Sequence, residues 1–264
     1  MRMANPKTAT ASAPATVANV SCGFDVFGFA VARPADEVRI ALTPTTDVRI
    51  ISITGDQGIL PTDASKNTAG VAVQMYLSHT GWKTGVNLEL RKNLPLGSGM
   101  GSSAASAVAA VLAINALHPQ PMLRKDLLPF ALEAERVACG AAHADNAAPS
   151  LLGGFTLIRS YNPLDVVPIA CPPELHCVLV HPHIEVKTKD ARNVMKTSVP
   201  MRDAITQWGN TAGLVAGLLT SDFELIGRSL QDVVAEPVRA LLIPGFHRIQ
   251  HRAKEVGALG CGIS

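Results

Sequence analysis

Apolar and polar residues alternate over three segments in the first part of the chain. Segments 36–43 and 47–53 have the two-residue period of half-buried β-strands, and Pro44–Thr46 between them is typical of a turn. A third alternating segment begins at residue 85 and carries apolar residues at positions 86, 88 and 90. We therefore expect three strands, the last of which enters a glycine-rich loop.

Helical spacing dominates three other segments of the same region. Residues 66–81 have apolar positions at helical intervals and end at Gly81, and Ala104–Ala116 consists mostly of good helix formers, so a helix should begin near Gly101 or Ser102. Residues 122–140 are also predicted to be helical. Pro129 either kinks this helix or marks its true start.

The second half of the chain mixes both patterns. Strands are expected at 153–160, 165–170 and 175–182, and residues 201–256 are mainly helical in pattern. Strands and helices that follow one another without strict alternation indicate an α+β protein. We expect a domain boundary near residues 160–173, which gives an N-terminal lobe of residues 1–160 and a C-terminal lobe of residues 161–264.

Composition excludes several classes of protein. A chain of 264 residues with 47% hydrophobic and 17% charged residues has ample material for a core and is globular. The net charge of +2 and the aromatic content of 4% argue against nucleic-acid binding. The sequence shows neither an apolar run of transmembrane length nor the hydrophobic stretch of a signal peptide. Five cysteines without a CxxC spacing predict reduced thiols in a cytoplasmic protein.

The loop before the helix at 102 is the first candidate for chemistry. Three glycines permit left-handed backbone angles and a close approach of a ligand, and the following helix start offers unpaired N–H groups and a positive dipole end. This arrangement predicts a phosphate site, although a tight turn with close packing is the alternative. No Lys-Ser or Lys-Thr pair follows the last glycine, as a Walker loop requires, and the glycine spacing is not that of a dinucleotide fingerprint. The predicted phosphate-binding residues are Pro95, Leu96, Gly97, Ser98, Gly99, Met100, Gly101, Ser102 and Ser103.

Polar residues in three further segments complete the candidate chemistry. Glu135, His143, Asp145 and Asn146 lie within twelve residues, and a magnesium ion prefers one or two carboxylates together with phosphate oxygens. A solvated carboxylate at Glu135 and a capped turn at residues 143–146 are the simpler interpretations. Without a G-x-S-x-G elbow, a serine hydrolase is excluded. Arg192, four residues after Thr188, and Arg239 lie in other segments of the chain. Their guanidinium groups are suited to bind a carboxylate or a phosphate, although ion pairs on the surface would also explain them.

Five stretches in order resemble one family. They read APATVANVSCGFDVFGFAV, PLGSGMGSSAASA, EAERVACGAAHADN, HIEVKTKDARNV and DVVAEPVRALLIPGF. The glycine-serine loop is similar to that of the GHMP kinase superfamily, and ANVSCGFD, HADN and TKDAR narrow the resemblance to the homoserine kinases. The resemblance extends from about residue 9 to the last residue.

The resemblance implies transfer of the ATP γ-phosphoryl group to the side-chain hydroxyl of L-homoserine, on the route to threonine. It also implies a two-lobed fold with mixed sheets, an active site between the lobes, and a homodimer. ATP phosphates would lie under residues 95–103 and the adenine near Asn67, while Ser103 and Glu135 would hold Mg²⁺. The positions that match the amino-acid pocket are Asn19, Asp25, His143, Asn146, Thr188, Arg192 and Arg239.

Homoserine is a zwitterion, and these residues suit it. Arg192 and Arg239 can bind its carboxylate, while Asp25, helped by Asn19, can take its ammonium group. Related mevalonate-type kinases carry an aspartate where this chain has Asn146, and an amide cannot act as a base. We therefore expect Ser103, Glu135, Asn146 and Arg192 to act by positioning and charge, without a dedicated general base.

The sequence is also compatible with two other functions, and it raises the question of how far the natural chain extends. The chain could be another GHMP small-molecule kinase, for which both arginines would not be needed, or a non-catalytic nucleotide or amino-acid sensor. Gly257, Gly260 and Gly262 resemble the opening of a third glycine-rich element, which in the family continues for several tens of residues. We therefore expect the natural protein to extend beyond Ser264.

Overall fold

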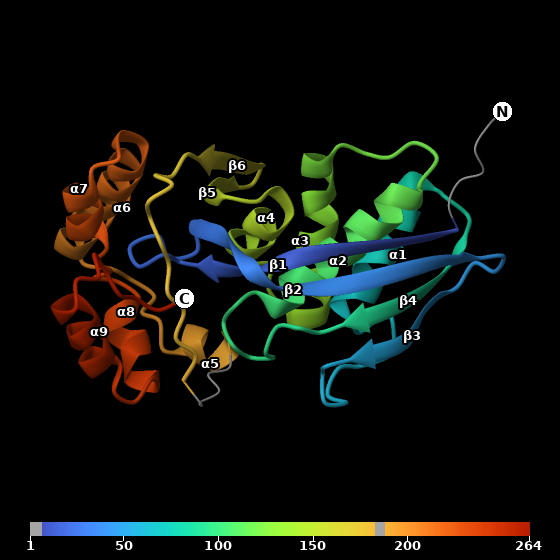
Figure 1. Ribbon diagram of the computed structural model, residues 1–264, viewed down its shortest axis with the longest axis horizontal. Coiled ribbons are helices and arrows are strands. Elements are labelled where there is room, and N and C mark those ends of the chain that lie inside the picture. Colours follow the sequence, from blue (N-terminus) through green and yellow to red (C-terminus); the bar gives the residue numbers. More distant parts are fainter. Residues whose placement is uncertain (1–6, 183–187) are drawn as a thin grey trace. The chain divides into compact units, whose positions relative to one another are not determined.

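The computed structural model describes residues 7–182 and 188–264, with side chains at 139 and 188–190 not described (Figure 1). The strands are β1 (Thr8–Ala18), β2 (Phe27–Thr43), β3 (Val48–Thr54), β4 (Gly85–Arg91), β5 (Phe155–Tyr161) and β6 (Leu164–Ile169). The helices are α1 (Thr68–Thr80), α2 (Ser102–Leu117), α3 (Leu128–Cys139), α4 (Ala144–Leu152), α5 (Thr188–Asn193), α6 (Met201–Thr220), α7 (Phe223–Ser229), α8 (Glu236–Arg239) and α9 (Phe246–Glu255). Short 3₁₀ helices occupy Arg124–Leu127 and Ala240–Leu242. Within the part of the chain that is described, no helix is both long enough and apolar enough to cross a bilayer.

The chain divides into two compact units that do not follow sequence order. The first contains the segment up to Thr16, Phe29–Leu96 and Met100–Gly153, and the second contains Val17–Gly28, Gly97–Gly99 and the chain from Gly154 onward. The predicted lobe boundary near residue 160 is close to the last of these divisions. Two earlier segments, however, belong to the later unit. Strand pairing over long sequence separations produces such interleaving, which composition does not reveal.

A mixed sheet forms in the first unit, as expected from the alternating segments. Strand β4 pairs antiparallel with β2, where Val38 lies opposite Leu90, and parallel with β3, where Ile50 lies opposite Leu88. Strand β1 pairs with β2. A turn joins β2 to β3, yet β4 lies between them, because β3 continues through the crossover helix α1 into a parallel neighbour.

Helices α1, α2, α3 and α4 pack on one another, and Figure 1 shows the first three side by side. All residues of α2 from Ala104 to Val111 are buried, so this helix is surrounded on every side. The predicted start at 101–102 is confirmed. Pro129 lies in the first turn of α3 and therefore marks the start of that helix rather than a kink.

The second unit combines a hairpin with a group of helices. Strands β5 and β6 pair antiparallel, and Ile158 N donates to Val26 O (2.7 Å) in the chain just before β2. Helices α6, α7, α8 and α9 confirm the helical pattern of residues 201–256. The predicted strand at 175–182 is wrong. That segment has no regular structure, and Val178 and Val180 are 86% and 68% exposed, because a short apolar run yields a strand only where a partner edge is available.

Candidate active site

The end of the glycine-rich loop packs too closely for any side chain at Gly101. The φ angles of Gly97, Gly99 and Gly101 are 67°, 73° and 67°, all in the left-handed region that favours glycine. A Cβ on Gly101 would lie 2.3 Å from Thr16 Oγ1 and 2.7 Å from Asn146 Oδ1. Gly101 is also the N-cap of α2 and has no side chain to accept from the first N–H groups of the helix. Those N–H groups are therefore available to an anion, which favours the predicted phosphate site.

A buried hydroxyl–carboxylate pair lies just inside α2. Ser103 Oγ donates to Glu135 Oε1 at 2.6 Å, and the backbone N–H of His143 donates to Glu135 Oε2 at 3.2 Å. Glu135 is only 1% exposed, so the interpretation as a solvated surface carboxylate is wrong. Burial raises the pKa of Glu135 from 4.5 to about 7, against the lowering effect of these two hydrogen bonds. Ionising Glu135 in this buried position costs free energy, and a bound cation would offset that cost.

This raised pKa predicts a pH dependence of stability in metal-free protein. Between pH 4.5 and about 7 the folded chain binds more protons at Glu135 than the unfolded chain, so the free energy of unfolding falls as pH rises through this window. The shift corresponds to roughly 3 kcal/mol. We expect urea unfolding at pH 5 and pH 8 to show a larger loss in the wild type than in Glu135→Gln. Equal losses in both proteins would contradict the pKa assignment.

Asn146 is held at the end of the loop by Thr16. Thr16 Oγ1 donates to Asn146 Oδ1 at 2.8 Å, and Thr16 N donates to Met100 O at 3.1 Å. The predicted capped turn at 143–146 is instead the start of α4, with Asp145 buried in its first turn. The first unit thus gathers Ser103, Glu135, His143 and Asn146 around the start of α2.

The start of α1 is hydrogen-bonded to the first turn of α2. Asn67 Oδ1 accepts from Ala69 N (3.0 Å) as a helix cap, and its amide nitrogen donates to Pro61 O (2.9 Å). The next residue, Thr68, donates from its hydroxyl to Ser103 O at 3.2 Å. The role of Asn67 near an adenine stays a prediction, because its amide already serves the backbone around it.

A second group of predicted residues gathers in the second unit. Arg192 binds Asp25 through both terminal nitrogens, at 3.1 and 3.0 Å, and Asn19 Oδ1 accepts from Asp25 N at 3.1 Å. The guanidinium carbons of Arg192 and Arg239 lie 6.0 and 5.6 Å from the centre of the Phe24 ring. The side chain of Thr188, the first residue of α5, lies outside the described residues.

The turn that carries this group has unusual backbone angles. Asn19, Val20, Ser21 and Asp25 all have positive φ, at 66°, 43°, 58° and 61°. A β-branched valine in the left-handed region is costly and persists only where the surroundings impose it, as they do at many binding sites.

Known homoserine kinases match both the sequence and the fold of this chain. The model of the GHMP kinases N terminal domain matches residues 67–154, which include the glycine-rich loop, Glu135 and Asn146. A homoserine kinase from Chloroherpeton thalassium is 54% identical over 98% of this chain and 84% of its own length, and one from Xylella fastidiosa is 42% identical over 97% and 79%. A crystal structure of homoserine kinase from Cytophaga hutchinsonii superposes with a TM-score of 0.97 at 55% identity, covering 100% of this chain and 84% of that one.

This chain belongs to the homoserine kinase family. The resemblance inferred from the five sequence stretches is thereby confirmed, as is the mixed α and β architecture of the GHMP fold. Mevalonate kinase from L. major, in complex with R-mevalonate, shares that fold at a TM-score of 0.68 and 15% identity.

Two further residues of this chain contact the predicted site residues but carry no distinctive sequence signal. Thr16 holds Asn146, yet it lies in a strand among apolar neighbours and resembles any buried strand threonine. Phe24 adjoins both arginines, and the only sequence signal is an aromatic residue beside Asp25 in a turn that contains Gly23.

Proposed function

We propose that this protein transfers the γ-phosphoryl group of ATP to the side-chain hydroxyl of L-homoserine, giving O-phospho-L-homoserine for threonine biosynthesis. The family is one of kinases, so ATP is the donor. The observation that carries the proposal is the buried Ser103–Glu135 pair at the start of a helix whose N-cap is glycine. That site offers N–H groups to phosphate oxygens, together with a hydroxyl and a carboxylate beside them.

The donor set fits a magnesium ion. Mg²⁺ accepts one or two protein oxygens and takes its other ligands from phosphate and water. Ser103 Oγ and Glu135 Oε1 are 2.6 Å apart, and among the side chains that the structure describes no cluster of three His, Cys, Asp or Glu offers a rival site. We infer that Ser103 and Glu135 hold the ion, which when bound neutralises charge on the transferring phosphate.

Both charges of homoserine find partners in the second unit. In the structure Asp25 and Arg192 satisfy one another, with side chains 32% and 41% exposed. Homoserine would separate this pair, because its ammonium group can take Asp25 and its carboxylate can take the fork of Arg192, joined by Arg239. A substrate with only one charge would leave one member of the pair uncompensated. The roles of His143, Asn146 and Thr188 in binding the substrate stay predictions.

A coupled ADP-release assay tests this function with two matched analogues. We expect 4-hydroxybutyrate, which lacks the ammonium group, and 3-aminopropan-1-ol, which lacks the carboxylate, each to lose at least about tenfold in kcat/KM relative to L-homoserine. Equal rates with an analogue would favour another small-molecule kinase. Binding of nucleotide and homoserine without ADP release would identify a sensor.

Proton transfer should not need a dedicated base. Asn146 is an amide whose oxygen already accepts from Thr16, and the loose transition state of phosphoryl transfer requires little deprotonation of the nucleophile. We expect Asp145→Asn and Asn146→Ala each to retain measurable turnover. A general base contributes about 10²- to 10⁴-fold. A loss of about four decades in Asp145→Asn with unchanged binding of both substrates would show that Asp145 is that base.

The homodimer implied by the resemblance and the cytoplasmic location predicted from the cysteines also remain proposals. Sedimentation equilibrium of the purified chain tests the first, and fractionation of the source cells tests the second.

A further inference from the structure

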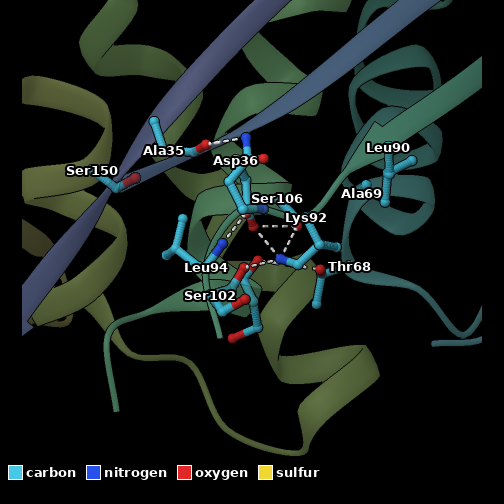
Figure 2. Close-up of polar contacts among 12 residues, drawn as sticks. Ala35, Asp36, Thr68, Ala69, Leu90, Lys92, Leu94, Ser102, Ser106 and Ser150 are labelled. Carbon is cyan, nitrogen blue, oxygen red and sulfur yellow. Dashed lines mark hydrogen bonds and ion pairs between the residues drawn. The ribbon is translucent and has the colours of Figure 1, made fainter. Parts of the chain in front are cut away.

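A buried ion pair outside the predicted site lies beside Leu94 and Ser102, at the two ends of the glycine-rich loop (Figure 2). Lys92 follows β4 directly, and Asp36 lies in β2. Their side chains are 2% and 1% exposed. Burying two charges is costly, and a hydrophobic pair of similar volume is often as stable, so the pair calls for an explanation other than stability.

The Lys92 ammonium group has an acceptor for each of its three protons. It donates to the carboxylate of Asp36, to Ser106 Oγ at 2.7 Å and to Ser102 O at 2.9 Å. Ser106 Oγ in turn donates to Asp36 Oδ2 at 3.2 Å, which closes the triangle drawn in Figure 2. Burial lowers the pKa of Lys92, and the charge of Asp36 opposes that lowering. A lysine committed in this way has no proton left for a phosphate oxygen.

The other carboxylate oxygen holds the chain where it enters the loop. Asp36 Oδ1 accepts from Asn93 N at 2.8 Å and from Leu94 N at 3.0 Å, immediately before Pro95. The amide of Asn93 donates to Ala35 O at 2.7 Å. Asp36 therefore fixes the entry of the loop, while Lys92 fixes Ser102 in the first turn of α2. One ion pair holds both ends of the loop.

We propose that the Lys92–Asp36 pair is a positioning device that sets the spacing between the entry of the loop and the first turn of α2, and so preforms the nucleotide phosphate site. The proposal rests on the proposed kinase function. Ser103 follows Ser102 directly, and its own carbonyl accepts from Thr68. The carbonyls of both serines are thus held from outside the helix, and Ser103 Oγ is directed to Glu135. Lys92 acts through the loop and not on the substrate.

The test removes the link without leaving a buried charge. Lys92→Met alone would strand the Asp36 carboxylate in the core, so the informative protein is the double variant Lys92→Met/Asp36→Asn. Asparagine keeps an oxygen for Asn93 N and Leu94 N, and only the connection to Ser102 and Ser106 is lost. The matched control is Arg39→Met/Glu89→Gln, which removes an exposed ion pair of 2.8 Å between strands β2 and β4.

We expect the double variant to fold, by circular dichroism and thermal unfolding, and to bind Mg·ADP about ten- to hundredfold more weakly in calorimetry without homoserine. Its KM for ATP should rise similarly, while its KM for homoserine and both constants of the control change less than about threefold. Asp36→Asn alone should weaken binding by an intermediate factor, because the ammonium group loses its charged partner.

Two outcomes would overturn the proposal. A folded double variant with wild-type affinity for Mg·ADP would make the pair purely structural, and tighter binding by Asp36→Asn would make Lys92 a phosphate ligand. The calorimetric readout needs no homoserine. A wild type that bound Mg·ADP but did not phosphorylate homoserine would therefore contradict the proposed function and leave this measurement decisive.

Discussion

Replacing Glu135 with glutamine is expected to lower kcat by about two to three orders of magnitude while the protein stays folded. The substitution keeps the shape of the side chain and an oxygen for Ser103 Oγ, which donates at 2.6 Å. It removes the negative charge that we propose binds Mg²⁺. Loss of one preorganised electrostatic partner typically costs about 10²- to 10³-fold in kcat. Coupled ADP release at several magnesium concentrations measures this effect.

Glu133→Gln is the matched control for this prediction. Glu133 lies in the same helix α3, two residues earlier, and pairs with Arg136 on the exposed surface. Its replacement should leave kcat unchanged, because an exposed ion pair contributes little to stability and its partner Arg136 lies in the same helix. Full turnover by Glu135→Gln at ordinary magnesium would remove Glu135 from the metal site and leave its burial unexplained.

Arg192→Lys and Arg239→Lys are each expected to raise the KM for homoserine about ten- to hundredfold. Lysine keeps the positive charge but lacks the planar fork that matches a carboxylate, and a charge-assisted hydrogen bond contributes roughly 1.5–3 kcal/mol. Arg192 shows this fork geometry in the structure, where two nitrogens meet the two oxygens of Asp25. The KM for ATP should change less than about threefold.

Initial rates with each substrate varied in turn measure both constants. Arg159→Lys serves as the control, because Arg159 pairs with Asp165 on the surface of the β5–β6 hairpin, in the same unit. A rise in the KM for ATP without one for homoserine would make these arginines phosphate ligands. The proposed orientation of the substrate would then be wrong.

Features that depend on neighbouring residues were predictable from the sequence. The start of α2 at Ser102 follows from glycines that tolerate positive φ and alanines that favour helix. Strands β3 and β4 follow from alternating apolar positions, and the end of α1 follows from Gly81. The five motifs also identified the family, because their order along the chain is a property of the sequence itself.

Burial and strand order were decided only by the tertiary structure. Glu135 near a predicted helix end resembles a surface carboxylate until α2 and α4 enclose it, and that enclosure raises its pKa to about 7. Strand β4 lies between β2 and β3 although β3 follows β2 directly in the chain, and residues 175–182 have strand-like composition without forming a strand.

The long-range polar contacts were also decided by the tertiary structure. Arg192 and Asp25 are 167 residues apart, and Lys92 and Asp36 are 56 apart, so no local spacing relates either pair. Lys92 beside Arg91 has the sequence signature of an exposed basic pair, yet it lies in the core with all three protons bonded. Apart from segments such as residues 175–182, the sequence determined where helices and strands form, because steric and helical preferences act over a few residues. Only packing decided which polar groups lose water, because desolvation depends on every segment that closes around them.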